Sequence, residues 1–163
     1  MRILILGAGV IGSVYAGRLH EAGHEVTLFV RGKRLTDLRT SGLILDDARS
    51  GHRTTHHLPV LASLDTEQQF VLVLVSVRRE QFAGAAAQLA TSSVEGDVML
   101  FGNATGLTHE LVALLVARAL LGFPAAGGVR DGGFSTRVST DADAWLIAHA
   151  AVRSTRRMCA VPR

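Results

Sequence analysis

Short apolar runs alternate along the chain with segments whose apolar residues recur at helical spacing. The run at residues 70–77, FVLVLVSV, is apolar on both faces, which is typical of a central strand covered by helices on both sides. Alternating strands and helices predict an α/β fold built on a doubly wound, mostly parallel sheet. The predicted strands lie at residues 3–6, 25–30, 70–77, 98–101, 120–123 and 134–138. The predicted helices lie at residues 11–22, 34–40, 81–89, 107–118 and 141–151.

A polar stretch after the second predicted helix interrupts this alternation. Two extended pieces, residues 43–45 and 54–60, flank a polar turn and predict a hairpin or an irregular excursion. The same stretch holds His52, His56 and His57, and a His-x-x-x-His spacing on a helix could bind zinc. Because helical periodicity, thiols and clustered carboxylates are missing there, we expect these histidines to lie in a solvated loop.

The first chemical motif is a glycine-rich loop between the first strand and the first helix. In such a loop the first glycine permits a tight turn, the second lets backbone approach a pyrophosphate, and the third lets helix and strand pack closely. The helix N-terminus adds free N–H groups and the positive end of its dipole. This context favours a dinucleotide-binding Rossmann domain over a glycine-rich turn without a ligand. The loop consists of Gly7, Ala8, Gly9, Val10, Ile11 and Gly12.

Arg31, which follows the second predicted strand, indicates which nicotinamide cofactor the domain would bind. Arg31 lies 19 residues past Gly12, close to the ~20 at which an NAD site places an acidic residue that binds the ribose 2′-hydroxyl. A guanidinium cannot accept that hydrogen bond, but its planar fork suits a 2′-phosphate. Lys33 and Arg34 add positive charge to the same loop. The pattern predicts NADP(H) rather than NAD(H), with a solvated basic turn as the alternative.

Four segments, ILILGAGVIGSVYAGRLHEAGHEVTLFVRGKRL, VLVSVRREQF, FGNATG and LLGFPAAGGVRDG, together resemble the N-terminal domain of ketopantoate reductases (2-dehydropantoate 2-reductases). The resemblance implies hydride transfer from NADPH to a 2-keto acid or related ketone. It implies that Arg31 binds the 2′-phosphate and that Asn103 lies on the nicotinamide side. Arg78 stands where the family has a cofactor-contacting lysine. The neighbours of Asn103 depart from the family pattern, which favours a related reductase over the enzyme of pantothenate biosynthesis itself.

The resemblance also implies a domain organisation. The family follows its nucleotide-binding domain with an all-helical domain that carries a catalytic lysine and a glutamate. Lys33 is the only lysine in this sequence, so no catalytic residue is assigned. We expect residues 1–140 to form the NADP-binding domain, residues 141–152 to begin a linking helix to an absent helical domain, and residues 153–163 to form a basic tail. That ending fits a frame-shifted or truncated reading, or an ordinary disordered tail.

Composition narrows the classes of protein that remain. Hydrophobic residues make up 48% and charged residues 19%, which is typical of a soluble globular chain. The central apolar run is far short of the roughly 20 residues that a membrane-spanning helix needs. The single cysteine, Cys159, agrees with a reducing cytoplasm. The net charge of +3 comes from four arginines within residues 151–163, so a nucleic-acid surface is not expected.

Three interpretations of function remain open. The first is a reductase acting on a small keto substrate. The second is a nucleotide-binding module without catalysis, as in potassium-uptake regulators, although those usually keep an acidic residue where this chain has Arg31. The third is a remnant that folds poorly. The oligomeric state cannot be inferred from the sequence.

Overall fold

Six parallel strands form the main sheet of the computed structural model, which describes residues 1–65, 67–94, 96–101, 119–122, 124, 126–131 and 135–139. The strand order β5-β2-β1-β6-β7-β8 places the first strand at the centre, with the chain winding outward first to one side and then to the other. This is the doubly wound order of a Rossmann sheet, as predicted. The strands are β1 (Arg2–Leu6), β2 (Glu25–Phe29), β5 (Val60–Leu61), β6 (Leu72–Val75), β7 (Asp97–Phe101) and β8 (Ala119–Gly122).

Helices cover both faces of this sheet. Ile3 and Ile5 belong to one buried cluster and Leu4 and Leu6 to another, because successive strand residues point to opposite faces. All four residues of β6 are buried, which confirms the predicted central strand. The helical elements are α1 (Val10–Glu21), α2 (Lys33–Ser41), the short 3₁₀ turn η1 (Arg79–Gln81) and α3 (Phe82–Ala90).

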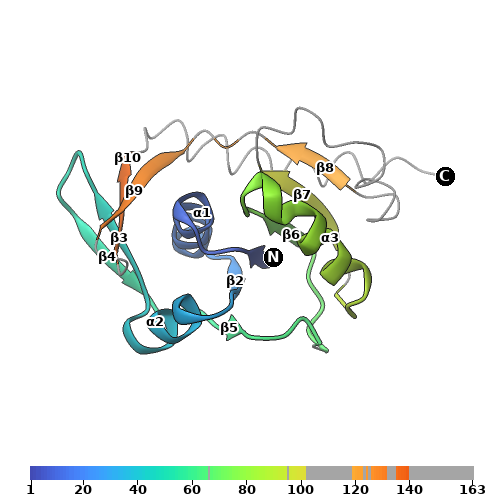
Figure 1. Cartoon of the computed structure of the whole chain (residues 1–163). Helices are drawn as coiled ribbons and strands as arrows, with labels where there is room; N and C mark the ends of the chain where they lie inside the picture. The colour runs from blue at the N-terminus through green and yellow to red at the C-terminus, as the bar shows by residue number, and fades with distance from the viewer. Residues whose placement is uncertain are drawn as a thin grey trace.

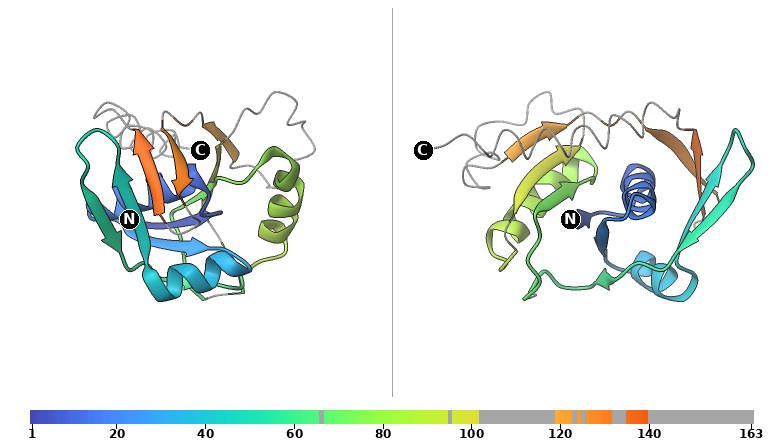
Figure 2. Two further views of the ribbon diagram at one scale, coloured as in Figure 1. Left: turned by 60° about the vertical axis from the view of Figure 1, so that its left-hand side comes forward. Right: turned by 180° about the vertical axis from the view of Figure 1, so that it is seen from behind.

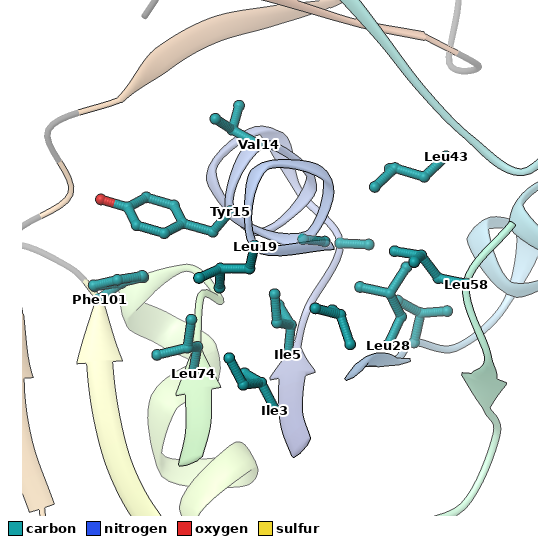
Figure 3. Packing of buried hydrophobic residues seen from close by; sticks show 14 of the residues in the cluster. Ile3, Ile5, Val14, Tyr15, Leu19, Leu28, Leu43, Leu58, Leu74 and Phe101 are labelled. Carbon is teal, nitrogen blue, oxygen red and sulfur yellow. The ribbon is translucent and has the colours of Figure 1, made fainter. Parts of the chain in front are cut away.

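Helix α1 packs its apolar face directly on the centre of the sheet. Figure 3 shows Leu19 and Tyr15 of α1 lying over Ile5, Leu74 and Phe101. The rings of Tyr15 and Phe101 lie 4.5 Å apart, centroid to centroid, in a tilted arrangement. This packing fixes the start of α1 at the end of β1.

The C-terminal end of α1 follows the sequence prediction closely. Gly23 adopts φ +83°, which only glycine reaches without strain. Its N–H donates to the carbonyl of His20, and the N–H of His24 donates to the carbonyl of Leu19. These two bonds form a Schellman motif, which supplies N–H donors to carbonyl groups that the end of the helix would otherwise leave unpaired.

The hairpin predicted from residues 43–45 and 54–60 is confirmed, but its second piece is divided between two sheets, so the predicted extent of that piece was wrong. Pro59 separates the two pieces, and its carbonyl accepts a hydrogen bond from the N–H of Leu28 in β2. Strand β5 pairs with β2, whereas the residues before Pro59 turn away to form a hairpin with the preceding strand. The hairpin consists of β3 (Leu43–Asp47) and β4 (Arg53–His56).

This hairpin belongs to a second sheet, of order β4-β3-β10-β9, that the sequence did not predict. Strand β10 (Ser135–Ser139) overlaps the strand predicted at 134–138, but it pairs with β3 and not with the main sheet. Strand β9 (Gly127–Asp131) pairs antiparallel with β10. Figures 1 and 2 show α1 lying between this sheet and the main sheet.

A glycine in α1 makes the close approach of the second sheet possible. A Cβ at Gly17 would overlap Cδ1 of Leu45 in β3 and would lie 3.2 Å from the His56 ring. Because Gly17 has no side chain, β3 and β4 pack directly against the helix. The carboxyl half of α1 is therefore covered on the side away from the main sheet.

His56 is a buried strand residue, so the predicted solvated loop was wrong for this histidine. Its Nε2 lies 3.2 Å from Oε1 of Glu21 and 3.1 Å from Oγ1 of Thr54. His52 and His57 are exposed, as expected. No group of three metal-ligating side chains occurs among the residues that the structure describes.

The helices predicted at residues 107–118 and 141–151, and the tail predicted at 153–163, lie outside the described residues. Within the described part of the chain, no helix has the length and apolar character needed to cross a membrane.

Candidate functional site

A cavity of about 540 Å³ lies at the carboxyl ends of the central strands. Leu6 ends β1, Phe29 ends β2, and Ser76 follows β6; all three line the cavity. In open parallel sheets, ligands bind outside the carboxyl ends of the strands where the winding direction reverses. The cavity occupies that position, between β2 and β6 on either side of β1.

The glycine loop forms one wall of this cavity. Gly7 has φ +98°, and a Cβ there would lie 2.9 Å from Cγ1 of Val77. A Cβ at Gly12 would overlap both the carbonyl oxygen of Gly7 and the hydroxyl of Ser76. The structure therefore requires glycine at both positions, the first for its backbone conformation and the second for packing.

Gly9 differs from these two glycines. Its φ of −70° is open to any residue, and no atom lies within 4 Å of a Cβ built there. Neither the conformation nor the packing of the protein explains a glycine at this position. The space beside Gly9 leaves room for a ligand to approach the backbone, which is the role predicted for the second glycine.

The N-terminus of α1 directs its first N–H groups toward the loop. The first hydrogen bond within the helix runs from the N–H of Ser13 to the carbonyl of Gly9 at 3.0 Å. The N–H groups of Val10, Ile11 and Gly12 precede it and have no intrahelical acceptor. The helix has no capping side chain and no acidic residue in its first turn, so an anion would meet no repulsion there.

Ser76 fixes the position of the loop. Its Oγ donates to the carbonyl of Gly7 at 2.7 Å, and its N–H donates to the carbonyl of Leu6 at 2.9 Å. These bonds join the end of β6 to the end of β1. Ser76 thus holds the turn that precedes α1.

Positive charge surrounds the cavity. Its described lining includes one acidic residue, Glu80, against four arginines. Arg31 is exposed, and no hydrogen bond or ion pair engages its guanidinium within the described part of the chain. The four arginines are Arg31, Arg34, Arg78 and Arg130.

Arg34 and Arg130 are the two arginines with direct contacts to the loop region. The Nη2 atom of Arg34 donates to the hydroxyl of Ser13 at 3.3 Å, and the Nη2 atom of Arg130 donates to the carbonyl of Ala8 at 2.6 Å. Burial lowers the pKa of Arg34 to about 10, and the positive charge of Arg130 contributes, whereas Asp37 raises it. Arg34 still carries its charge at neutral pH.

The predicted site residues are only partly brought together. Gly7, Ala8, Gly9, Arg31 and Arg78 line the cavity. Val10, Ile11 and Gly12 follow directly at the start of α1 and are not among the lining residues, and Lys33 is exposed at the start of α2 without lining the cavity. Asn103 lies outside the described residues.

Arg130 is the residue that sequence reasoning missed. It lies in the segment LLGFPAAGGVRDG, but no motif assigns it to the glycine loop. It reaches the loop because β9 belongs to the second sheet, which packs against α1. A prediction of that sheet from the sequence would have been needed to find it.

Comparisons with known proteins agree with this architecture. The chain is 34% identical over 76 residues to the uncharacterized oxidoreductase YkpB of Bacillus subtilis, an alignment covering 47% of this chain and 24% of that protein. The crystal structure of 2-dehydropantoate 2-reductase from Methylococcus capsulatus superposes with a TM-score of 0.76 at 19% identity, covering 95% of this chain and 55% of that one. The ternary structure of D-mandelate dehydrogenase with NADH and anilino(oxo)acetate gives a TM-score of 0.73 at 22% identity, covering 85% and 45%.

These solved structures share the fold, and the chain spans about half of their length. The family described as Ketopantoate reductase PanE/ApbA matches residues 3–150, which is most of the chain. Reductases are oxidoreductases, so the description of the family gives its class of enzyme. The chain therefore belongs to the ketopantoate reductase family.

Proposed function

We propose that this chain binds NADP(H) in the cavity beside the glycine loop, as the nucleotide-binding part of a reductase that transfers hydride from NADPH to a 2-keto acid or related ketone. One observation carries the proposal: Arg31 and the glycine loop line the same cavity. A donor with a planar fork stands where an NAD site would need an acceptor for the 2′-hydroxyl.

The residues present fit a dinucleotide. The open space at Gly9 accommodates a pyrophosphate close to the backbone, and the N–H groups at the start of α1 can donate to it. The arginines on the cavity wall offer charge-assisted hydrogen bonds to phosphate oxygens. Lys33 contributes to this proposal only as a nearby positive charge.

The cofactor, when bound, supplies the hydride. The chain's own residues bind and orient it: Gly7 and Gly12 set the turn, Ser76 holds that turn against β6, and Arg31 selects the phosphate form. Arg78 stands on the β6 side of the cavity and Asn103 is assigned to the nicotinamide side by family resemblance.

The proposal assigns no proton donor to this chain. Lys33, the only lysine in the sequence, does not line the cavity. This observation favours a second candidate function, in which the chain binds NADP(H) without turning over a keto substrate. For either candidate we propose a cytoplasmic location, on the evidence of the single cysteine.

Calorimetric titration of the full chain with NADPH and with NADH tests cofactor choice. We expect NADPH to bind at least about tenfold more tightly, because a charge-assisted hydrogen bond contributes about 1.5 to 3 kcal/mol. Comparable affinity for both cofactors would contradict the proposal.

Oxidation of NADPH in the presence of ketopantoate, followed at 340 nm on the same preparation, separates the candidates. Binding with turnover supports a reductase with this substrate, and binding alone supports the non-catalytic module. Absence of both binding and turnover would support the third interpretation, a remnant that folds poorly. Circular dichroism of the same sample would detect poor folding independently.

A further inference from the structure

Two arginines, Arg34 of helix α2 and Arg130 of strand β9, donate to neighbouring atoms at the glycine loop. The carbonyl oxygen of Ala8 accepts from Nη2 of Arg130 at 2.6 Å and from the hydroxyl of Ser13 at 3.4 Å. The same hydroxyl accepts from Nη2 of Arg34 at 3.3 Å. One backbone carbonyl and one hydroxyl thus anchor guanidinium groups from α2 and β9 at one wall of the cavity.

Arg130 lies close enough to Arg34 for its charge to act on that residue. The positive charge of Arg130 adds to burial in lowering the pKa of Arg34, and Asp37 offsets only part of that effect. Because a guanidinium is positively charged at neutral pH, the folded protein holds two like charges together. A group with more than one negative charge between them would relieve this repulsion.

A phosphate monoester has the charge and the acceptors that such a pair would bind. It carries about −1.5 to −2 charge at pH 7 and three acceptor oxygens, which match the planar forks of two arginines. The pyrophosphate already has the N–H groups at the start of α1 as donors. The monoester of NADP(H) is its 2′-phosphate.

The position of the pair also fits the 2′-phosphate. The adenosine ribose of a dinucleotide lies at the end of the second strand. Arg34 lies three residues beyond Arg31, in the first turn of α2, and both line the cavity there. Arg130 contacts the glycine loop beside Arg34.

The geometry points to Arg130 as a specificity-determining residue: together with Arg34 it binds the 2′-phosphate from the side of the second sheet, while Arg31 binds it from the end of β2. The inference rests on the proposed binding of NADP(H). It gives the second sheet a part in cofactor choice, through a residue 118 positions beyond the last glycine of the loop motif.

The test uses the full chain and two probes that differ only in the 2′-phosphate, adenosine 2′,5′-bisphosphate and AMP. We expect the unmodified protein to bind the bisphosphate at least about tenfold more tightly. Arg130→Gln should lose most of that factor while its affinities for AMP and NADH stay within about twofold. Arg130→Lys should be intermediate, because lysine keeps the charge but not the planar fork.

Val129→Gln provides the matched control, since Val129 is the neighbouring residue of β9 and is 70% exposed. It should leave the affinities for both probes unchanged. Thermal unfolding of each variant shows whether it is folded. If Arg130→Gln does not fold, the comparison of the two probes is made with Arg130→Lys.

The outcomes separate this inference from the proposed function. An unmodified chain without preference for the bisphosphate would overturn the proposed function and this inference together. A preference that persists in both Arg130 variants would overturn only the role of Arg130. Equal losses for AMP and the bisphosphate in Arg130→Gln would also overturn it, because they would assign Arg130 to positioning the loop for any adenine nucleotide.

Discussion

The hydroxyl of Ser76 donates a 2.7 Å hydrogen bond to the carbonyl of Gly7 and thereby ties the end of β6 to the turn before α1. The two residues are 69 positions apart in the sequence. The same hydroxyl occupies the space into which a side chain at Gly12 would project. The shape of the glycine loop thus depends on a strand that is remote in the sequence.

We predict that Ser76→Ala lowers the free energy of unfolding by about 1 kcal/mol, the net contribution of one such hydrogen bond. It should also weaken NADPH binding several-fold, because the loop loses its support. Ser92→Ala is the control, since Ser92 Oγ donates to the carbonyl of Leu89 at 2.8 Å and Ser92 is not among the residues that line this cavity. Chemical denaturation and calorimetry should show similar destabilisation for both variants but weaker binding only for Ser76→Ala. Equal effects on binding would refute a role of Ser76 in positioning the loop.

The glycines of the loop should respond differently to alanine. Gly12→Ala places a methyl group against the backbone of Gly7, which cannot move freely, so we expect a loss of about 1 to 3 kcal/mol of stability. Gly9→Ala meets no atom within 4 Å and should leave the melting temperature unchanged or slightly raised. Its NADPH dissociation constant should nevertheless rise at least about tenfold. Unimpaired binding by Gly9→Ala would show that the space beside Gly9 is not used.

Exchanging the charge at Arg31 should reverse cofactor preference. In Arg31→Asp, a carboxylate repels the 2′-phosphate of NADPH and can accept a hydrogen bond from the 2′-hydroxyl of NADH. The affinity for NADPH should therefore fall at least about tenfold, and the affinity for NADH should rise. Arg2→Asp makes the same change of charge at the opposite end of β1, where Arg2 is exposed. Calorimetry of both variants with both cofactors separates a local effect from one of net charge. A similar loss of NADPH affinity in both variants would argue against a specific contact at Arg31.

The second sheet should make stability depend on pH through His56. Burial lowers the pKa of His56 below its usual value of 6.5, although the carboxylate of Glu21 partly counteracts this effect. The folded state prefers the neutral imidazole of His56. The contribution of His56 to the free energy of unfolding is therefore fully present above about pH 6.5 and is lost as the pH falls. We expect the melting temperature to fall between pH 7 and pH 5, and less steeply in His56→Gln.

Two further variants check this assignment. Glu21→Gln removes the acidic partner, so the pKa of His56 measured by NMR should fall further. His52→Gln changes an exposed histidine of the same hairpin region and should leave the pH dependence of the melting temperature as it is. A pKa of His56 above 6.5 would show that the carboxylate of Glu21 outweighs burial and would contradict the expected loss of stability at acidic pH.

Sequence reasoning predicted five of the six strands of the main sheet, all except β5, because each of those five has a local signature. Continuous apolar runs bounded by glycines and polar residues identify buried parallel strands, and the helical period of α1 ends at Gly23, where a Schellman motif closes the helix. The glycine loop was equally visible, since its three glycines lie between a strand and a helix. These features depend on residues that are neighbours in the chain.

The second sheet was not predictable in the same way. Its strands are short and half polar, and β3 pairs with a strand about 90 residues later in the sequence. Their periodicity alone does not say which sheet they join. Pro59 signals a break, but not that the residues on its two sides belong to different sheets.

The sequence by itself determined a doubly wound nucleotide-binding fold, a glycine loop at the start of α1 and a cation where an NAD site has an acid, because strand and helix periods and motif spacing are local properties of the chain. Only the tertiary structure decided that His56 is buried, that Ser76 holds the loop, and that Arg130 joins Arg34 at the cavity. Each of those facts is a contact between segments far apart in sequence. Such contacts depend on which strands pair and on how the two sheets pack on α1, and the local period of the residues specifies neither.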